Sequence, residues 1–233
     1  MKSSEKIKFI SNWIKTYVDQ MPSKAQSLVI GISGGIDSSV SSTLSAMTGI
    51  KTIVLTMPIR QKDNQHDLSL KHQKWLKKKF KNVEAHTVNL DKLFDSFSSS
   101  LKEFDNEHGF ANSRARLRMT TLYQVAAANK GIVVGTGNKV EDFGVGFYTK
   151  YGDGGVDISP IADCNKTDVW ELGKELGILK EIIDAPPTDG LWDDGRTDEG
   201  QLGFKYEDLE DAMKNPNSTH RQEYEKIRKQ NLH

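Results

Sequence analysis

The chain has 233 residues, with 32 lysines and arginines against 32 aspartates and glutamates, so its formal net charge at pH 7 is zero. This length suffices for one sizeable α/β domain, and we expect a single domain over residues 1–233. The balanced charge argues against nucleic-acid binding. The single cysteine, Cys164, excludes an intramolecular disulfide and a cysteine zinc cluster, and it indicates a reducing, cytoplasmic compartment.

The first half of the sequence alternates between strand-like and helix-like segments. Residues 1–20 carry apolar side chains at helical spacing among charges, which predicts an amphipathic helix and neither a signal peptide nor a membrane span. The patterns predict strands at 28–32, 52–57, 83–88 and 131–136, and helices at 37–47, 66–80 and 113–129. This alternation indicates an α/β fold with a doubly wound, mostly parallel sheet flanked by helices.

The second half contains two segments without periodicity. Residues 137–157 hold five glycines after Asp142, and a loop of this length is usually functional. We expect residues 184–200 to form a loop as well. Asn165 is suited to cap a helix that ends at Gly177. The pattern of residues 206–233 predicts two polar helices that are separated near Pro216.

A turn rich in glycine and serine follows the first predicted strand. Its residues are Gly31, Ile32, Ser33, Gly34, Gly35, Ile36, Asp37 and Ser38. Such a turn directs backbone N–H groups and the positive end of a helix dipole at one spot, which favours a bound anion. The turn lacks the Lys-Ser/Thr pair of a Walker A loop, and it lacks the third glycine of a dinucleotide fingerprint. Asp37 beside a phosphate would need a bridging cation, which points to Mg²⁺. The alternative is that Asp37 and Ser38 merely cap the helix.

Three motifs carry a resemblance to known families. The run from Ser33 to Ser38 resembles the SGGxDS loop of the ATP pyrophosphatases, and the segments 135–141 and 147–157 resemble the GTxxxxE and FFTKYGDGGxD segments of NAD synthetases. The resemblance implies an adenine nucleotide alpha hydrolase-like, Rossmann-like fold and a homodimer. It also implies an ammonia-dependent ligase that amidates deamido-NAD with ATP to give NAD, AMP and pyrophosphate through an adenylated intermediate, as the last step of NAD biosynthesis.

The resemblance also implies roles for single residues. ATP would be bound by the whole turn from Gly31 to Ser38 and by Thr136, Lys166 and Thr188, while Asp37 and Glu141 would hold Mg²⁺. Deamido-NAD would be bound by Arg116, Lys150, Asp157 and His233. Lys166 would neutralise the departing pyrophosphate, and Asp153 is our candidate for helping ammonium lose its proton. The plain alternatives are a surface glutamate at Glu141 and a turn hydrogen bond at Asp153.

The sequence departs from the family pattern in two places. The chain stops at His233 without the following lysine and final segment of the family, so we expect a truncated C-terminal tail. One additional residue stands between Glu141 and Lys150. We expect most of the six histidines to lie on the surface, because none has metal-ligand spacing.

Other functions remain open on the sequence. We expect no glutaminase domain, so ammonia would be free or come from a partner. The alternatives are another ATP pyrophosphatase, such as a GMP synthetase-like enzyme or a tRNA-modifying ligase, and a non-catalytic nucleotide-binding sensor.

Overall fold

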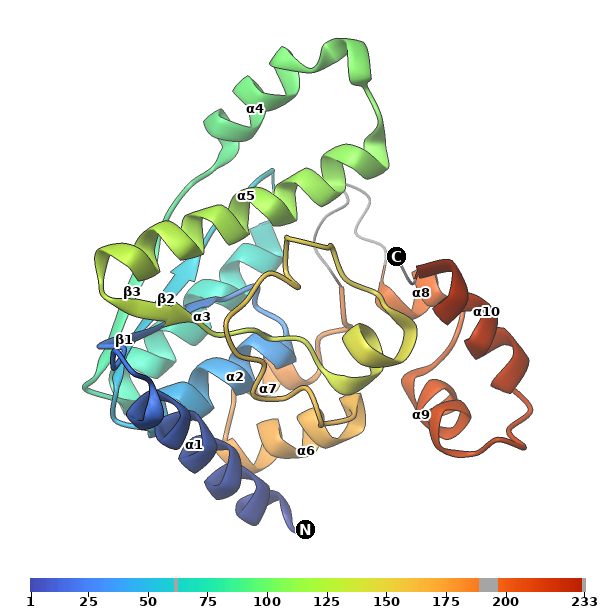
Figure 1. Ribbon diagram of the computed structural model, residues 1–233, viewed down its shortest axis with the longest axis horizontal. Helices are drawn as coiled ribbons and strands as arrows, with labels where there is room; N and C mark the ends of the chain where they lie inside the picture. Colours follow the sequence, from blue (N-terminus) through green and yellow to red (C-terminus); the bar gives the residue numbers. More distant parts are fainter. Residues whose placement is uncertain (61–62, 189–196, 232–233) are drawn as a thin grey trace.

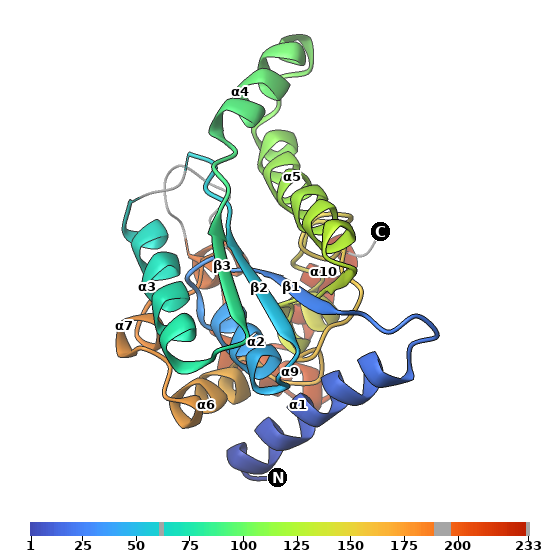
Figure 2. The same ribbon diagram turned by 90° about the vertical axis from the view of Figure 1, so that its left-hand side faces the viewer.

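The computed structural model describes residues 1–60, 63–188 and 197–231. Its centre is a parallel four-stranded sheet in the order β3-β2-β1-β4 (Figures 1 and 2). The strands are β1 (Ser27–Gly31), β2 (Lys51–Thr56), β3 (Val83–Thr87) and β4 (Gly131–Val133). The predicted parallel α/β sheet is confirmed. The last strand is shorter than expected because Val134 makes only an isolated bridge to Ile158.

Helix α2 (Ile36–Met47) packs against the sheet and is buried almost all round. Most of its serine and threonine hydroxyls have hydrogen-bond partners: Thr43 Oγ1 donates to the Ser39 carbonyl (2.6 Å) and Ser45 Oγ donates to the Ser41 carbonyl (2.8 Å), whereas Ser41 Oγ is buried without a partner among the described residues. A helix of small polar residues can occupy the core because most of its hydroxyls need no water.

Helices cover both faces of the sheet. One face carries α2, α1 (Ser3–Gln20) and α6 (Lys166–Leu176), and α3 (Asp63–Lys79) lies beside them against β2 and β3. The opposite face is covered by α5 (Glu107–Ala128), which contacts β1 and β4. Alternate residues of β1 serve the two layers, because Leu28 and Ile30 belong to the α1–α2–α6 core and Val29 to the α5 core.

An arm projects from the body of the molecule. It consists of α4 (Asp91–Ser100), the 3-10 turn η1 (Lys102–Phe104) and the beginning of α5 (Figures 1 and 2). Leu93 and Phe104 on this arm are 50% and 74% exposed.

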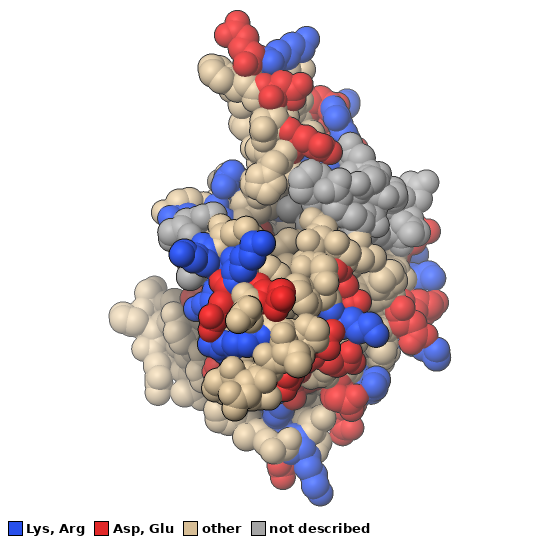
Figure 3. Space-filling model, turned by 90° about the vertical axis from the view of Figure 1, so that its right-hand side faces the viewer, with Lys and Arg blue, Asp and Glu red and all other residues tan. Residues whose placement is uncertain are grey.

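The C-terminal helices form a separate apolar cluster beside the sheet. They are α8 (Asp198–Leu202), α9 (Tyr206–Lys214) and α10 (Arg221–Asn231), whereas the preceding α7 (Lys180–Ile183) packs through Ile182 into the α1–α2–α6 core. The side chains of α9 and α10 pack on Val140 and Val145 of η2 (Lys139–Val145), a turn of π-helix. Figure 3 shows charges of both signs intermixed over this side of the molecule.

The structure corrects two sequence expectations, and one histidine is an exception to the expected surface positions. Residues 137–157 were expected to be loop throughout, but they contain η2, and the expected loop at 184–200 includes the start of α8. Both helices are too short for periodicity to reveal them. His72 is fully buried, where its Nε2 lies 3.0 Å from Ser42 Oγ and its ring stacks on Trp75. No helix of the described residues has the length and apolarity needed to cross a membrane.

Candidate active site

The glycine- and serine-rich turn lies where β1 ends and α2 begins. Gly34 has a φ of +94°, which only glycine adopts readily, and Gly35 is the N-cap of α2. The turn is closed by its own hydroxyls, because the Ser33 amide donates to Ser38 Oγ (3.3 Å) and Ser38 Oγ donates to the Gly35 carbonyl (3.1 Å). The N-terminus of α2 therefore faces the carboxyl edge of the sheet, where open α/β folds bind ligands.

Glu141 is brought to the same edge by Asn138. Asn138 is fully buried and caps η2, since its side-chain oxygen accepts from the amides of Val140 and Glu141. Its amide nitrogen donates to Asp37 Oδ1 (3.0 Å) and to Glu141 Oε2 (2.7 Å). One buried side chain thus joins the two carboxylates, which are 104 positions apart in the sequence (141 − 37).

Lys166 bridges this carboxylate pair. It is 1% exposed at the first turn of α6, and its Nζ lies 2.6 Å from Asp37 Oδ2 and 2.8 Å from Glu141 Oε1. Burial by itself lowers the pKa of Lys166, but the two carboxylates raise it above its ordinary value. The lysine is therefore charged at neutral pH, and this partly offsets the negative charge of the pair.

The carboxylates were tested as a magnesium site on their donor chemistry. Among the described residues, no group of three or more histidine, cysteine, aspartate or glutamate side chains is arranged to hold a metal alone. A pair of carboxylates beside the glycine- and serine-rich turn nevertheless fits Mg²⁺, which is commonly held by one or two carboxylates together with substrate phosphates. Asp37 and Glu141 suit a metal that arrives with a nucleotide.

A cavity of about 550 Å³ opens over this edge. It joins the turn to the face of α5 and to the glycine-rich segment 146–156. The predicted site residues that line it are Gly31, Ile32, Ser33, Asp37, Ser38, Arg116, Thr136, Glu141, Lys150, Asp153 and Thr188. Lys166 lies beneath this lining, bound to two of its members.

The α5 side of the cavity carries the cations expected to bind the second substrate. Arg116 is exposed into the cavity, and its Nε donates to the Lys150 carbonyl (3.1 Å). Asp153 accepts a hydrogen bond from the Thr149 amide (3.0 Å), which is the turn contact given above as its plain alternative. Asp153 also faces the cavity, so the bond leaves its proposed chemical role untested.

The other predicted residues differ in position. Asp157 is not among the residues that line the cavity, and it accepts instead from the Val133 amide (2.7 Å) and from Tyr123 Oη (3.0 Å). His233 lies outside the described residues. Gly34, Gly35 and Ile36 shape the turn without lining the cavity. The predicted ligand contacts of all five remain predictions.

Asp142 adds a further carboxyl group to the cavity. A Cβ atom at Gly137 would lie 1.8 Å from Asp142 Oδ2, so the glycine makes the space that this carboxyl group occupies. Burial, together with the charges of Asp153, Glu141 and Asp37, raises the pKa of Asp142 to about 8. The cavity wall therefore contains a carboxyl group that is largely protonated at pH 7.

Sequence reasoning missed two members of the carboxylate cluster. Asn138 follows the strand within the GTxxxxE segment, so its position beside Glu141 offered a signal. Tyr206 Oη donates to Glu141 Oε1 at 2.5 Å. Its position in a polar C-terminal helix gave no such signal, because only tertiary packing brings it to the site.

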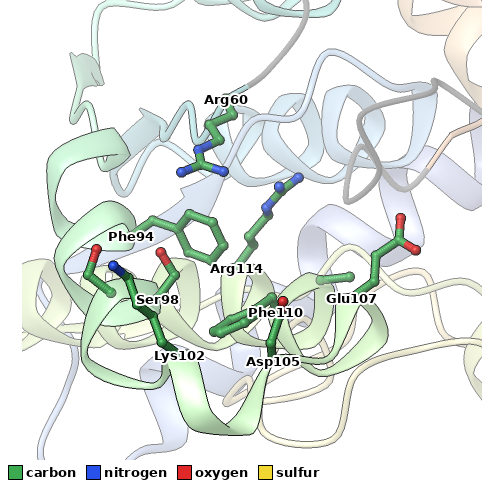
Figure 4. Close-up of a pocket in the computed structure, with 10 residues that line it drawn as sticks. Arg60, Phe94, Ser98, Lys102, Asp105, Glu107, Phe110 and Arg114 are labelled. Atoms are coloured by element: carbon green, nitrogen blue, oxygen red, sulfur yellow. The ribbon is translucent and has the colours of Figure 1, made fainter.

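A second cavity, of about 360 Å³, lies between the arm and the body (Figure 4). Arg60 comes from the loop after β2 and Arg114 from α5, and their guanidinium carbons lie 5.3 and 4.9 Å from the centre of the Phe94 ring. This cavity also contains Asp105 and Glu107, but the anion-binding turn and the carboxylate pair do not line it. The larger cavity is therefore the candidate active site.

Comparisons with known proteins agree with this geometry. A family model described as NAD synthase matches residues 6–233. An NH₃-dependent NAD⁺ synthetase of Carboxydothermus hydrogenoformans is 37% identical over 211 residues, which is 88% of this chain and 83% of that protein. A synthetase of the same name from Sulfurisphaera tokodaii is 36% identical over 88% of this chain and 71% of that protein.

Solved structures with the same fold include an NMN synthetase from Francisella tularensis, with a TM-score of 0.90 and 31% identity over 99% of this chain and 94% of that one. An NH₃-dependent NAD synthetase from Campylobacter jejuni, in complex with nitrate, has a TM-score of 0.79 and 23% identity over 99% and 95% of the two chains.

Proposed function

The chain belongs to the NAD synthase family, and we propose that it catalyses the ATP-dependent amidation of deamido-NAD with ammonia, giving NAD, AMP and pyrophosphate. It is a ligase of the NAD synthetase type. One observation carries the proposed chemistry. A phosphate-binding turn, a carboxylate pair bridged by Lys166 and a cation-bearing face of α5 surround one cavity of about 550 Å³.

ATP is expected to bind with its phosphates at the N-terminus of α2. The amides and hydroxyls of the turn suit phosphate oxygens, and Thr136 and Thr188 line the same cavity. Asp37 and Glu141 would hold Mg²⁺, which would supply positive charge to neutralise the phosphate groups of ATP. The Lys166 ammonium, already beside both carboxylates, is close enough to this edge to offset charge on the departing pyrophosphate.

The acceptor is expected to lie along α5. Arg116 and Lys150 suit its pyrophosphate and its nicotinate carboxylate. In the first step, a carboxylate oxygen attacks the α-phosphorus of ATP and the bond to the β-phosphate oxygen breaks, releasing pyrophosphate. In the second step, the lone pair of ammonia attacks the acyl carbon, AMP leaves with the bonding electrons, and the amide nitrogen loses a proton. Asp153 remains our candidate to take a proton from ammonium.

A second candidate acceptor is the corresponding mononucleotide. The solved NMN synthetase resembles this chain more than the Campylobacter NAD synthetase does, with a TM-score of 0.90 against 0.79 and an identity of 31% against 23%. Amidation of a nicotinate mononucleotide needs the same turn, carboxylate pair and lysine. The two reactions differ only in whether a second nucleotide half must be accommodated.

One assay distinguishes these functions. Pyrophosphate and AMP release are followed with ATP, Mg²⁺ and ammonium, while the acceptor is omitted, supplied as deamido-NAD, or supplied as nicotinate mononucleotide. We expect release only with an acceptor, and the higher kcat/KM identifies the substrate. Release that is independent of both acceptors would refute the synthetase proposal and favour another ATP pyrophosphatase. Absence of any release would favour the nucleotide sensor.

The remaining expectations concern the oligomeric state and the cellular compartment of the enzyme. We propose that it forms a homodimer, on family resemblance alone, and that it works in the cytoplasm, on its single buried cysteine. Sedimentation of the purified chain tests the dimer.

A further inference from the structure

Tyr206 is a residue of the C-terminal helices that no part of the proposed mechanism uses. Tyr206 begins α9 and is 1% exposed. Its ring packs edge-on against Trp170 of α6, with the ring centres 5.8 Å apart, and its amide donates to Glu199 Oε1 (3.1 Å). The side chain is therefore held in one orientation.

Tyr206 contacts both Glu141 and Lys166. Its hydroxyl donates to Glu141 Oε1 at 2.5 Å, and the Lys166 Nζ lies 4.9 Å from the centre of its ring. Glu141 Oε1 also accepts from Lys166, while Oε2 accepts from Asn138. Both oxygens of Glu141 are thus hydrogen-bonded, and the tyrosine supplies a donor from the C-terminal helices.

The same helix also supports α6. Glu210 lies one turn after Tyr206 on α9, is 6% exposed, and accepts from the Thr167 amide (2.9 Å) and from Thr167 Oγ1 (2.7 Å). Thr167 is the neighbour of Lys166. One face of α9 therefore holds the glutamate through Tyr206 and the start of the lysine-bearing helix through Glu210.

We propose that Tyr206 is a positioning residue for the metal–nucleotide site: its hydroxyl orients Glu141 toward Asp37 before Mg²⁺ and ATP arrive. The inference rests on the proposed function, because it assigns the two carboxylates to Mg²⁺. A long glutamate side chain loses rotamer freedom when it becomes a ligand, and a fixed orientation removes that cost in advance. Without the hydroxyl, Glu141 keeps only the bonds from Lys166 and Asn138, so the metal must complete the ordering of this side chain and binds more weakly.

The variant Tyr206→Phe removes the hydroxyl and keeps the ring under Lys166. Tyr224→Phe is the matched control. Tyr224 belongs to the same apolar cluster, is 6% exposed, and its hydroxyl donates to the Gly144 carbonyl (3.2 Å) without touching either carboxylate. Both variants remove a tyrosine hydroxyl that donates a hydrogen bond, and only Tyr206→Phe removes the bond to Glu141.

Two measurements test the inference. Mn²⁺ binding to the full chain in the presence of a non-hydrolysable ATP analogue is followed by electron paramagnetic resonance, and the Mg²⁺ dependence of pyrophosphate release is measured separately. Losing a hydrogen bond to a charged group, here the bond from Tyr206 to Glu141, corresponds to a weakening of metal binding by about tenfold. We expect Tyr206→Phe to weaken Mn²⁺ binding by about tenfold, to recover kcat at saturating Mg²⁺ and to leave the acceptor KM unchanged, whereas Tyr224→Phe binds Mn²⁺ like the wild type.

A third variant tests whether Tyr206 acts through Glu141. In Glu141→Gln, the carboxylate that the hydroxyl orients is absent, so adding Tyr206→Phe should weaken Mn²⁺ binding no further. Wild-type Mn²⁺ affinity in Tyr206→Phe, an equal loss in Tyr224→Phe, or additive losses in the double variant would each overturn the inference. A wild-type chain that binds Mn²⁺ and nucleotide but releases no pyrophosphate would refute the proposed function instead.

Discussion

Replacing Lys166 with methionine tests the charge balance of the candidate site. The wild-type cluster of Asp37, Glu141 and Lys166 carries two negative charges and one positive charge, and the lysine side chain is only 2% exposed. The variant leaves two carboxylates, 17% and 14% exposed, without their cation. Breaking a buried ion pair in this way costs about 3–5 kcal/mol. For a chain of this size, the melting temperature should fall by about 6–20 °C.

The sign of this effect is fixed by the pKa of the lysine. Burial lowers the pKa of Lys166, but the two carboxylates raise this pKa above its ordinary value of 10.5. The folded chain therefore binds the lysine proton more tightly than the unfolded chain does. The stabilising contribution of the lysine charge is fully present at neutral pH, and on the alkaline side it is lost only as the pH rises through the higher folded pKa. Measurements at pH 7.5 therefore report all of it.

Mg²⁺ should partly rescue Lys166→Met, because the divalent cation can replace the lost ammonium between Asp37 and Glu141. At 100 times its Kd, a ligand restores about 2.7 kcal/mol of unfolding free energy. The wild type should gain less, since its lysine competes for the same oxygens. The assay is urea unfolding at pH 7.5 with and without Mg²⁺.

Lys174→Met is the matched control for this experiment, because Lys174 lies on the same helix, is 58% exposed and pairs only with Glu171 in the ion pairs described. Its unfolding free energy should change by less than about 0.5 kcal/mol. A Lys166→Met chain that is as stable as the wild type without metal, or that gains no more from Mg²⁺ than the control, would refute the reasoning.

Three further predictions concern single side chains. Burial lowers the pKa of His72 from 6.5 to about 4, so the unfolded chain binds a proton that the folded chain does not, and unfolding free energy should fall by up to about 3 kcal/mol as the pH drops from 6.5 to 4. Urea titrations should show this slope reduced in His72→Gln. Asp153→Asn keeps the side-chain acceptor for the Thr149 amide and removes the charge, so amide formation should slow by about 100-fold or more while adenylation, measured as pyrophosphate release, continues. Arg116→Ala should raise the KM for the acceptor by about tenfold and leave the KM for ATP unchanged in steady-state assays.

Each of these predictions has a contrary outcome. His86→Gln is the control for the histidine, because His86 is 57% exposed, and an equal loss of slope in both variants would contradict the role of burial. Full amide formation in Asp153→Asn would limit Asp153 to its turn hydrogen bond. An Arg116→Ala enzyme with an altered KM for ATP and an unaltered KM for the acceptor would move the acceptor site away from α5.

The sheet and its helices could be predicted from local patterns. The apolar run of β1 and the alternation of strands with helices imply parallel strands buried on both faces, and Asn165 with Asp168 forms the capping box of α6. The helix η2 could not be predicted, because seven residues of π-helix leave no periodic signal. The buried position of His72 also escaped prediction, since its partner Ser42 lies on another helix.

The sequence by itself determined the anion-binding turn, because a strand, two glycines and a helix start create that geometry locally, and its motifs identified the family. The tertiary structure alone decided what surrounds the turn. Asp37, Glu141 and Lys166 come from three separate elements, and Asn138 and Tyr206 join them through hydrogen bonds that span up to 101 positions of the chain. Contacts of that range depend on how the elements pack, which no local pattern encodes.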